Sequence, residues 1–418
     1  MRSWQKNSVG LALRQIEPIL AMGTFAASSL FSLLLAFVLV PSLYGLMMTW
    51  QAAVLFVSSF LTTRTYELFF HLQSKHAVDS QSAFRASLRI EIISSIAIVA
   101  ICTIAAFFSA SSNAPVPKAT NVAILSALIA FGTMQGSSVA WLRYGGHWRL
   151  VATADFICIL TWGVALTILM VSGIRDPLTL LLLNGLAQGV RAASLFVACA
   201  VTFGRTAASD ECLKTPELGK ILKFIFGGQI ANALKNGSTS FETIIVAAFF
   251  GPVTVAIYRI ARALIGLPTA ALNILLQKSY PTLTQSAHGY ERQQLQQKLA
   301  RQSIKVAVIL YPVAAGVGVI YAFIKPEVGL IQFQLILAVC YLTLIPAAQQ
   351  QAAFVILSVN GQHSALSIGY IVAFLFLLLS VGLLLFYPSL TIFLLSVLGA
   401  AVIRAWVINT SFHRSQVL

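Results

Sequence analysis

Charged side chains are scarce in this sequence. Asp, Glu, Lys and Arg make up 9% of the 418 residues, whereas hydrophobic residues make up 58%. A soluble globular protein is nearer a quarter charged, so the composition excludes a chain whose whole surface faces water. The mean hydropathy is +0.86. Apolar runs of about 20 residues recur, and each is long enough to cross a hydrocarbon layer of about 30 Å as a helix.

Patterns that carry chemistry are missing as well. We find no paired carboxylates, no nucleophile beside a base, no histidine cluster and no glycine-rich phosphate loop at a shared face. Four of the five cysteines lie within apolar runs, and no pair suggests a disulfide or a metal site. These absences argue against an enzyme and predict neither a metal centre nor a resident cofactor.

The apolar runs predict an all-α integral membrane protein of about twelve transmembrane helices. Helices satisfy every backbone group within one segment, which lipid requires because it offers no hydrogen-bonding partner. The first six predicted spans cover about 19–40, 44–63, 90–109, 121–142, 150–173 and 177–203. The second six cover about 224–250, 252–277, 306–324, 331–358, 364–386 and 389–409.

Lys and Arg are distributed unevenly between the predicted loops. With both termini in the cytoplasm, that side receives 19 of them and the opposite side three, namely Lys118, Arg175 and Lys325. This positive-inside bias predicts cytoplasmic termini and an even number of spans. It also accounts for most of the net charge of +15. Because the basic residues are spread over short loops, we predict no nucleic-acid partner.

A turn motif occurs twice, which suggests an internal duplication. Pro41 and Gly45 in VPSLYGL match Pro252 and Ala256 in GPVTVAI, 211 residues further along the 418-residue chain. The repeat predicts two pseudo-symmetric six-helix lobes at 1–204 and 224–418, joined by a cytoplasmic linker at 205–223. Lobes of the same orientation are related by an axis along the membrane normal, and they enclose a central cavity.

The stretch FETIIVAAFFGPVTVAIYRIARALIGLPTAALNILLQKSYPTLTQ carries a family resemblance. An acidic residue, an apolar run, a Gly-Pro turn, a Tyr, a basic residue and a later Pro occur here in order, at Glu242, Gly251, Pro252, Tyr258, Arg259 and Pro281. This pattern resembles the seventh and eighth helices of oligosaccharide flippases of the Wzx-like polysaccharide-biosynthesis family. The PSLYGL turn also resembles the first helix pair of that family.

The resemblance implies the fold of the MOP superfamily (multidrug/oligosaccharidyl-lipid/polysaccharide exporters), as in MATE transporters. It further implies a location in the bacterial inner membrane and alternating access. The cargo would be a polyprenyl-diphosphate-linked oligosaccharide, such as an O-antigen or other surface-polysaccharide repeat unit, moved from the cytoplasmic to the periplasmic leaflet. Implied partners are this lipid-linked glycan, membrane lipid, and glycan polymerase and export proteins.

Charges inside the spans are the candidate site residues, because burying them in lipid costs about 2.5–3.5 kcal/mol each. Glu242 and Arg259 fall at matching depth on consecutive antiparallel helices, so an ion pair between them is one reading. In our hypothesis Lys235, Arg259 and Arg262 line the cavity and bind the anionic headgroup, with Arg191 in the other lobe. The alternative for each cation is a snorkelling or paired structural role.

The first lobe offers a second acidic position. Asp155 could pair with Arg191, or it could take part in coupling to H⁺ or Na⁺. Gln135, Gln188 and Asn232 supply uncharged hydrogen-bonding groups at membrane depth, which suit a sugar or an interhelical hydrogen bond equally. Arg404, near the cytoplasmic end of the last span, is expected to snorkel.

Two other functions compete with the flippase. An ion-coupled multidrug antiporter of the same superfamily would favour an acidic cavity for cationic drugs, whereas five basic and two acidic residues are clearly embedded here. A membrane glycan polymerase or ligase would place its chemistry on a large periplasmic loop, and the longest predicted outer loop spans only about 109–120.

Overall fold

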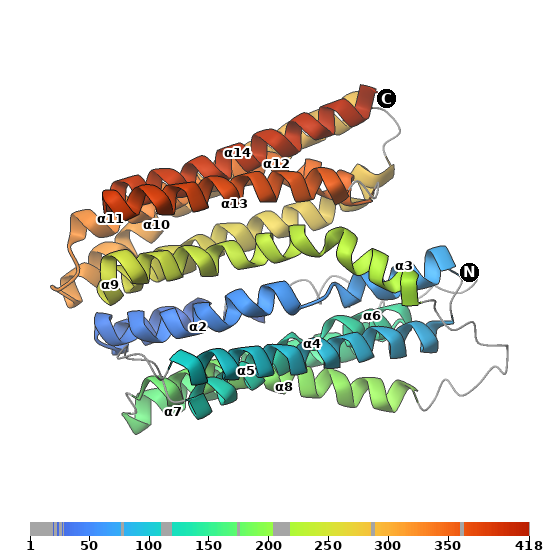
Figure 1. Cartoon of the computed structure of the whole chain (residues 1–418), viewed down its shortest axis with the longest axis horizontal. Coiled ribbons are helices and arrows are strands. Elements are labelled where there is room, and N and C mark those ends of the chain that lie inside the picture. Colours follow the sequence, from blue (N-terminus) through green and yellow to red (C-terminus); the bar gives the residue numbers. More distant parts are fainter. Residues whose placement is uncertain are drawn as a thin grey trace. The chain divides into compact units, whose positions relative to one another are not determined.

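The computed structural model describes residues 20–417, apart from 21–22, 25–26, 28, 77–78, 110–118, 174–175, 204–217, 286–288 and 360–362. Every regular element within these ranges is a helix (Figure 1). The earlier helices are α2 (Pro41–Leu61), α3 (Thr65–His76), α4 (Ser80–Ser109), α5 (Ala119–Thr133), α6 (Gly136–Tyr144), α7 (Trp148–Ser172) and α8 (Pro177–Phe203). The later helices are α9 (Leu218–Gln285), α10 (Gly289–Ile324), α11 (Leu330–Leu342), α12 (Leu344–Val359), α13 (His363–Phe386) and α14 (Leu390–Val417).

Within the described part of the chain, ten helical stretches are long and apolar enough to cross a membrane. One of them, Gln229–Gly266, covers most of the predicted seventh span and part of the eighth, which Gly251 separates with non-helical dihedral angles (φ 78°, ψ 174°). The other predicted spans from the second onward each overlap one stretch. The first lies partly outside the described residues, where an apolar helix covers Ser29–Val38. The predicted all-α membrane fold is therefore confirmed.

The described chain forms two compact units. The first contains residues up to Phe31 together with Val57–Gln229, and the second contains Ser32–Phe56 together with the chain from Ile230 onward. Each unit has a buried apolar core, represented by Phe69 and Trp141 in the first and by Tyr370 and Phe412 in the second. The predicted lobe boundaries around the linker at 205–223 remain a prediction.

The two units pack their helices in the same order. In the first, α4 packs on α5, α5 and α6 pack on α8, and α7 packs on α8. In the second, α10 packs on α11 and α12, these pack on α14, and α13 packs on α14. The corresponding helix is interrupted in both units, between α5 and α6 at Met134–Gln135 and between α11 and α12 at Thr343. This recurrence supports the internal duplication suggested by the turn motif.

The two copies of the turn motif pack against each other in the second unit. A methyl group added at Gly45 would overlap the carbonyl oxygen of Pro252 and lie 2.6 Å from its carbonyl carbon. Both atoms of Pro252 belong to the backbone at the tight turn after Gly251, so they cannot move aside as a flexible side chain could. The close approach of α2 and α9 therefore requires a residue without a side chain at position 45.

We expect Gly45→Ala to lower the free energy of unfolding by about 1–3 kcal/mol, because the added methyl group overpacks this contact. The measurement is thermal unfolding of the purified protein in detergent. Gly163→Ala is the matched control, since a methyl group at Gly163 in α7 would meet no atom within 4 Å. An unfolding temperature for Gly45→Ala equal to that of the control would contradict the proposed packing.

Candidate functional site

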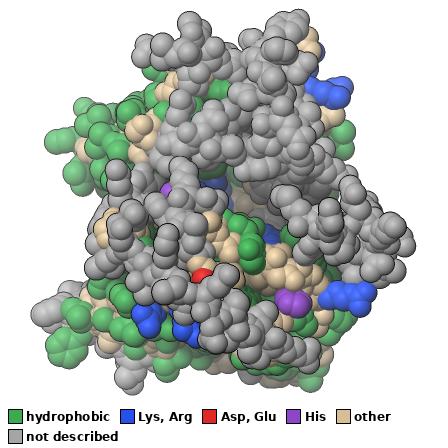
Figure 2. Space-filling model, turned by 90° about the vertical axis from the view of Figure 1, so that its right-hand side faces the viewer, with side chains coloured by type: hydrophobic (Ala, Val, Ile, Leu, Met, Phe, Trp, Pro, Cys, Tyr) green, Lys and Arg blue, Asp and Glu red, His purple; other side chains and the backbone are tan. Residues whose placement is uncertain are grey.

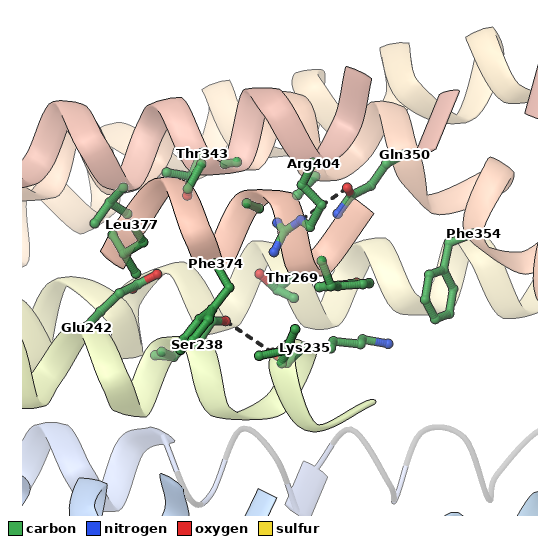
Figure 3. Close-up of a pocket in the computed structure, with 18 of the residues that line it drawn as sticks. Lys235, Ser238, Glu242, Thr269, Thr343, Gln350, Phe354, Phe374, Leu377 and Arg404 are labelled. Atoms are coloured by element: carbon green, nitrogen blue, oxygen red, sulfur yellow. Dashed lines mark hydrogen bonds between the residues drawn. The ribbon is translucent and has the colours of Figure 1, made fainter. Parts of the chain in front are cut away.

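The second unit contains a cavity of about 430 Å³. Helices α9, α12, α13 and α14 contribute most of its wall, as Figure 3 shows. Its charged residues are Lys235, Glu242, Arg262 and Arg404. Of the seven cavity residues predicted from the sequence, Lys235 and Arg262 line this space, and the predicted acid Glu242 joins them.

The turn at Gly251 creates the central charge network of the cavity. It folds α9 back on itself, which brings Glu242 beside Tyr258 and Arg262 although they are 16 and 20 residues apart. The Glu242 carboxylate accepts a hydrogen bond from the Tyr258 hydroxyl and forms an ion pair with the Arg262 guanidinium. Arg262 Nε in turn donates to the Tyr258 oxygen at 3.0 Å. The negative charge is therefore neutralised within one helical hairpin.

The reading that pairs Glu242 with Arg259 is wrong, since the acid contacts Arg262 instead. Positions 258 and 262 are one turn apart and share a face of α9, whereas position 259 is rotated by about 100° from 258. Matching the depth of two residues on adjacent helices does not fix which face each one occupies. Arg259 is half-buried and does not line this cavity of the second unit, so its proposed role in binding the headgroup stays a prediction.

Two further cations contact uncharged groups. Lys235 Nζ lies 4.4 Å from the ring centroid of Phe354. Arg404 Nε donates to Gln350 Oε1 at 3.2 Å, and its guanidinium carbon lies 5.3 Å from the ring centroid of Tyr370. Aromatic rings and amides hold a cation in place without cancelling its charge. Arg404 therefore brings positive charge to the cavity, and Lys235 lies on the same wall.

The expectation that Arg404 snorkels to the membrane surface is wrong. Its side chain faces the cavity and bonds to Gln350 on α12 (Figure 3). Ala400 and Ala401, which precede it on α14, line the same cavity. The small residues just before Arg404 and the unusual Gln349–Gln351 run were the available sequence signals for an inward-facing polar surface.

The remaining predicted residues lie outside this cavity. Arg191 Nε forms an ion pair with Asp155 Oδ1 at 2.6 Å in the first unit, and Asp155 is fully buried. Gln135 donates to the carbonyl of Gly132 at the α5–α6 interruption, and Gln188 packs against Gly132. Asn232, on α9, accepts a hydrogen bond from Asn236 Nδ2 at 3.2 Å. For these residues the structure shows contacts with neighbouring protein groups.

Glu91 is a buried acid that the sequence analysis missed. The predicted third span began at position 90, which placed Glu91 at its edge beside the basic residues Arg85 and Arg89. Helix α4 begins at Ser80, so Glu91 lies about 16 Å along a membrane-spanning helix, and it is 5% exposed. An apolar run follows Glu91 without a break, and this was the sequence signal that Glu91 belongs to the same helix as the run.

The Glu242–Arg262 pair makes a testable contribution to stability. We expect Glu242→Gln and Arg262→Gln each to lower the free energy of unfolding by about 3 kcal/mol, because each leaves one charge without its partner. The double variant should be more stable than the sum of the two losses predicts. Glu67→Gln is the control, since Glu67 is 46% exposed where it contacts Arg64 at 3.0 Å. Additive losses in thermal unfolding would contradict the coupling.

Solved structures share this fold over nearly the whole chain. The MATE multidrug transporter DinF-BH, determined as a complex, aligns with a TM-score of 0.64 at 14% identity, covering 99% of this chain and 98% of that one. A MATE transporter of the MOP superfamily in an outward-facing conformation aligns with a TM-score of 0.63 at 14% identity, covering 97% and 95%. An inward-facing structure aligns with a TM-score of 0.57 at 14% identity, covering 96% and 94%.

Comparison of the sequence with known families and proteins does not assign the chain to a family. No protein-family model matches the chain, and no curated protein matches it either. Identity of 14% to the solved structures supports a shared fold and leaves the cargo open. The chain therefore has the fold of the MATE transporters of the MOP superfamily.

Proposed function

We propose that this protein is a membrane transporter that moves a polyprenyl-diphosphate-linked oligosaccharide from the cytoplasmic to the periplasmic leaflet. The observation that carries this proposal is the charge of the second-unit cavity, where Lys235, Arg262 and Arg404 face a single carboxylate, Glu242. Glu242 is already neutralised by Arg262. The space that remains is positively charged, and its complement is an anionic ligand.

A diphosphate group fits the chemistry of these cations. Arg404 has no carboxylate partner in the described part of the chain, and its hydrogen bond to Gln350 uses only Nε. The terminal nitrogens of its guanidinium can therefore bind phosphate oxygens in pairs. Lys235 lies seven residues before Glu242 on α9, about 10 Å along the helix axis. Cations at different depths can bind the headgroup in succession as it moves through the cavity.

The uncharged part of the wall suits the sugars of such a cargo. Gln350, Gln351, Ser238 and Thr239 supply donors and acceptors, and Phe354 is one of several aromatic rings beside them. A pocket of this kind positions a ligand through a few polar groups on a largely apolar wall. A lipid-linked oligosaccharide combines the anionic and the polyhydroxylated parts that the wall can bind.

We place the protein in the bacterial inner membrane with both termini in the cytoplasm. The bias of Lys and Arg toward one side supports this orientation. Figure 2 shows the end of the molecule at the right of Figure 1, where Lys and Arg are the main charged groups in view. In this orientation Lys235, near the start of the described α9 span, is the first cavity cation that a cytoplasmic headgroup reaches.

Multidrug antiport is the second candidate, and the aromatic lining favours it. Phe354, Tyr370 and Phe374 could stack on flat drug molecules, and one of the solved structures with this fold is named as a MATE multidrug transporter. Lys235 and Arg404 on the wall of the cavity would repel a cationic drug. The excess of positive charge makes an anionic cargo the better match.

We expect Arg404→Ala to slow transport of the lipid-linked oligosaccharide about tenfold or more at subsaturating concentration, because a charge-assisted hydrogen bond contributes about 1.5–3 kcal/mol. Arg404→Lys should recover part of the rate. The measurement uses proteoliposomes that contain the purified protein and a polyprenyl-diphosphate-linked oligosaccharide, and it follows the fraction of oligosaccharide accessible from each leaflet. The double variant Lys235→Ala/Arg404→Ala should be slower than either single variant.

Lys305→Ala is the matched control, since Lys305 is an exposed cation of the same unit on α10 and does not line the cavity. It removes an equal charge and should leave the rate unchanged. A second arm adds a cationic dye, which we expect not to inhibit transport. If no oligosaccharide moves, or if the dye is transported while Arg404→Ala has no effect on oligosaccharide movement, the flippase assignment fails and multidrug antiport is favoured.

A further inference from the structure

The buried Glu91 of the first unit is held by hydrogen-bond donors from two other helices. Its carboxylate accepts from the hydroxyl of Thr65 at the start of α3 and from the hydroxyl of Ser137 in the first turn of α6. The backbone N–H of Ser137 also donates to it at 2.9 Å. A methyl group at Gly136 would lie 3.0 Å from the carboxylate, so the helices approach closely here. Three donors fit the ionised form of the acid.

This charge has no basic partner within the described ranges. The ion pairs of the described residues involve Glu67, Asp155 and Glu242. The hydrogen bonds that Glu91 accepts there come from Thr65 and Ser137. A carboxylate buried inside a membrane-spanning helix is costly unless a positive charge accompanies it. Hydrogen bonds from Thr65 and Ser137 reduce that cost without supplying the missing charge. A small positive species beside Glu91 would supply it.

A space for such a species lies next to the carboxylate. A cavity of about 10 Å³ is lined by Glu91 together with Thr62, Thr63, Ser94, Ser95, Thr133 and Met134. That volume is close to the minimum that holds one water molecule. It accommodates one small ion and excludes an organic ligand.

The wall of the small cavity is rich in oxygen atoms that can accept a cation. Thr63 Oγ1 is buried and has no hydrogen-bond partner in the described structure. Ser95 and Thr133 donate their protons to the carbonyl of Ala130, at 3.3 Å and 2.7 Å, which leaves lone pairs on both hydroxyl oxygens. Hard cations prefer this kind of all-oxygen environment.

Two helices are interrupted at this cavity. Thr62 and Thr63 belong to the non-helical link between α2 and α3, and Met134 belongs to the turn between α5 and α6. Interrupted helices within a membrane expose backbone groups that regular helices keep bonded internally, and such groups serve as ion ligands. The hydroxyls, the carboxylate and the interruptions come from different parts of the sequence and meet at one point.

We propose that the small cavity beside Glu91 binds a monovalent cation of the size of Na⁺, with Glu91 as its charged ligand. Hydroxyls of Thr63, Ser94, Ser95 and Thr133 complete the oxygen shell. The site lies in the first unit and is separate from the basic cavity of the second. It goes beyond the proposed transport function, because cation binding would tie together the links that precede α3 and α6 whatever the cargo is.

The test is the melting temperature of the purified full-length protein in detergent with NaCl, KCl or choline chloride at equal ionic strength. A ligand that binds only the folded state stabilises it, so saturating Na⁺ should raise the melting temperature by about 2 °C or more. Neither K⁺ nor choline should produce this shift. Glu91→Gln and Thr63→Val should each reduce or abolish the Na⁺ response, and Glu67→Gln, which changes an exposed acid of the same unit, should retain it.

Several outcomes would overturn the proposal. The absence of a Na⁺-specific shift in the unaltered protein is one, and a full Na⁺ response in both Glu91→Gln and Thr63→Val is another. A melting temperature that responds to acidification and not to Na⁺ would assign the missing charge to a proton. If Glu91→Gln does not fold, Thr63→Val still decides, because valine keeps the shape of threonine and removes only its hydroxyl.

Discussion

A charge on a membrane-spanning helix must be neutralised or held in a polar cavity, and this constraint shapes both units of the protein. Asp155 and Arg191 satisfy it as a direct ion pair. Glu242 and Arg262 satisfy it through a network that includes Tyr258. These paired charges stabilise helix register and are unavailable to a ligand. The charged side chains that can bind a ligand are those outside such pairs.

Each unit also has a charge beside a cavity with no counter-ion among the described residues, and these two charges differ in sign. In the second unit Arg404 contacts Gln350 and Tyr370, uncharged groups that leave its positive charge beside a cavity of about 430 Å³. In the first unit a buried carboxylate without a basic partner in the described residues, Glu91, lies beside a cavity of about 10 Å³. Both units use the same helix packing order. The two units thus combine a similar packing order with different electrostatics.

The fold was predictable because it depends mainly on the length of apolar runs, which are local features of the sequence. Apolar runs located the spans, and the Gly251–Pro252 pair located the break between the seventh and eighth. Residue partners were less predictable, since they depend on helix rotation and on where each helix begins. Arg262 replaced Arg259 as the partner of Glu242 for the first reason, and Glu91 escaped notice for the second. Arg404 was misjudged because closeness to a span end does not show which way a side chain faces.

The central claim is that cations of the second-unit cavity receive an anionic headgroup. The most direct measurement is an experimental structure of the protein with a polyprenyl-diphosphate-linked oligosaccharide. Our account predicts diphosphate oxygens within hydrogen-bond distance of Arg404 and of Lys235, with the sugars against Gln350 and Gln351. A headgroup bound elsewhere, with Arg404 still bonded to Gln350 and the cavity empty of ligand, would contradict the account.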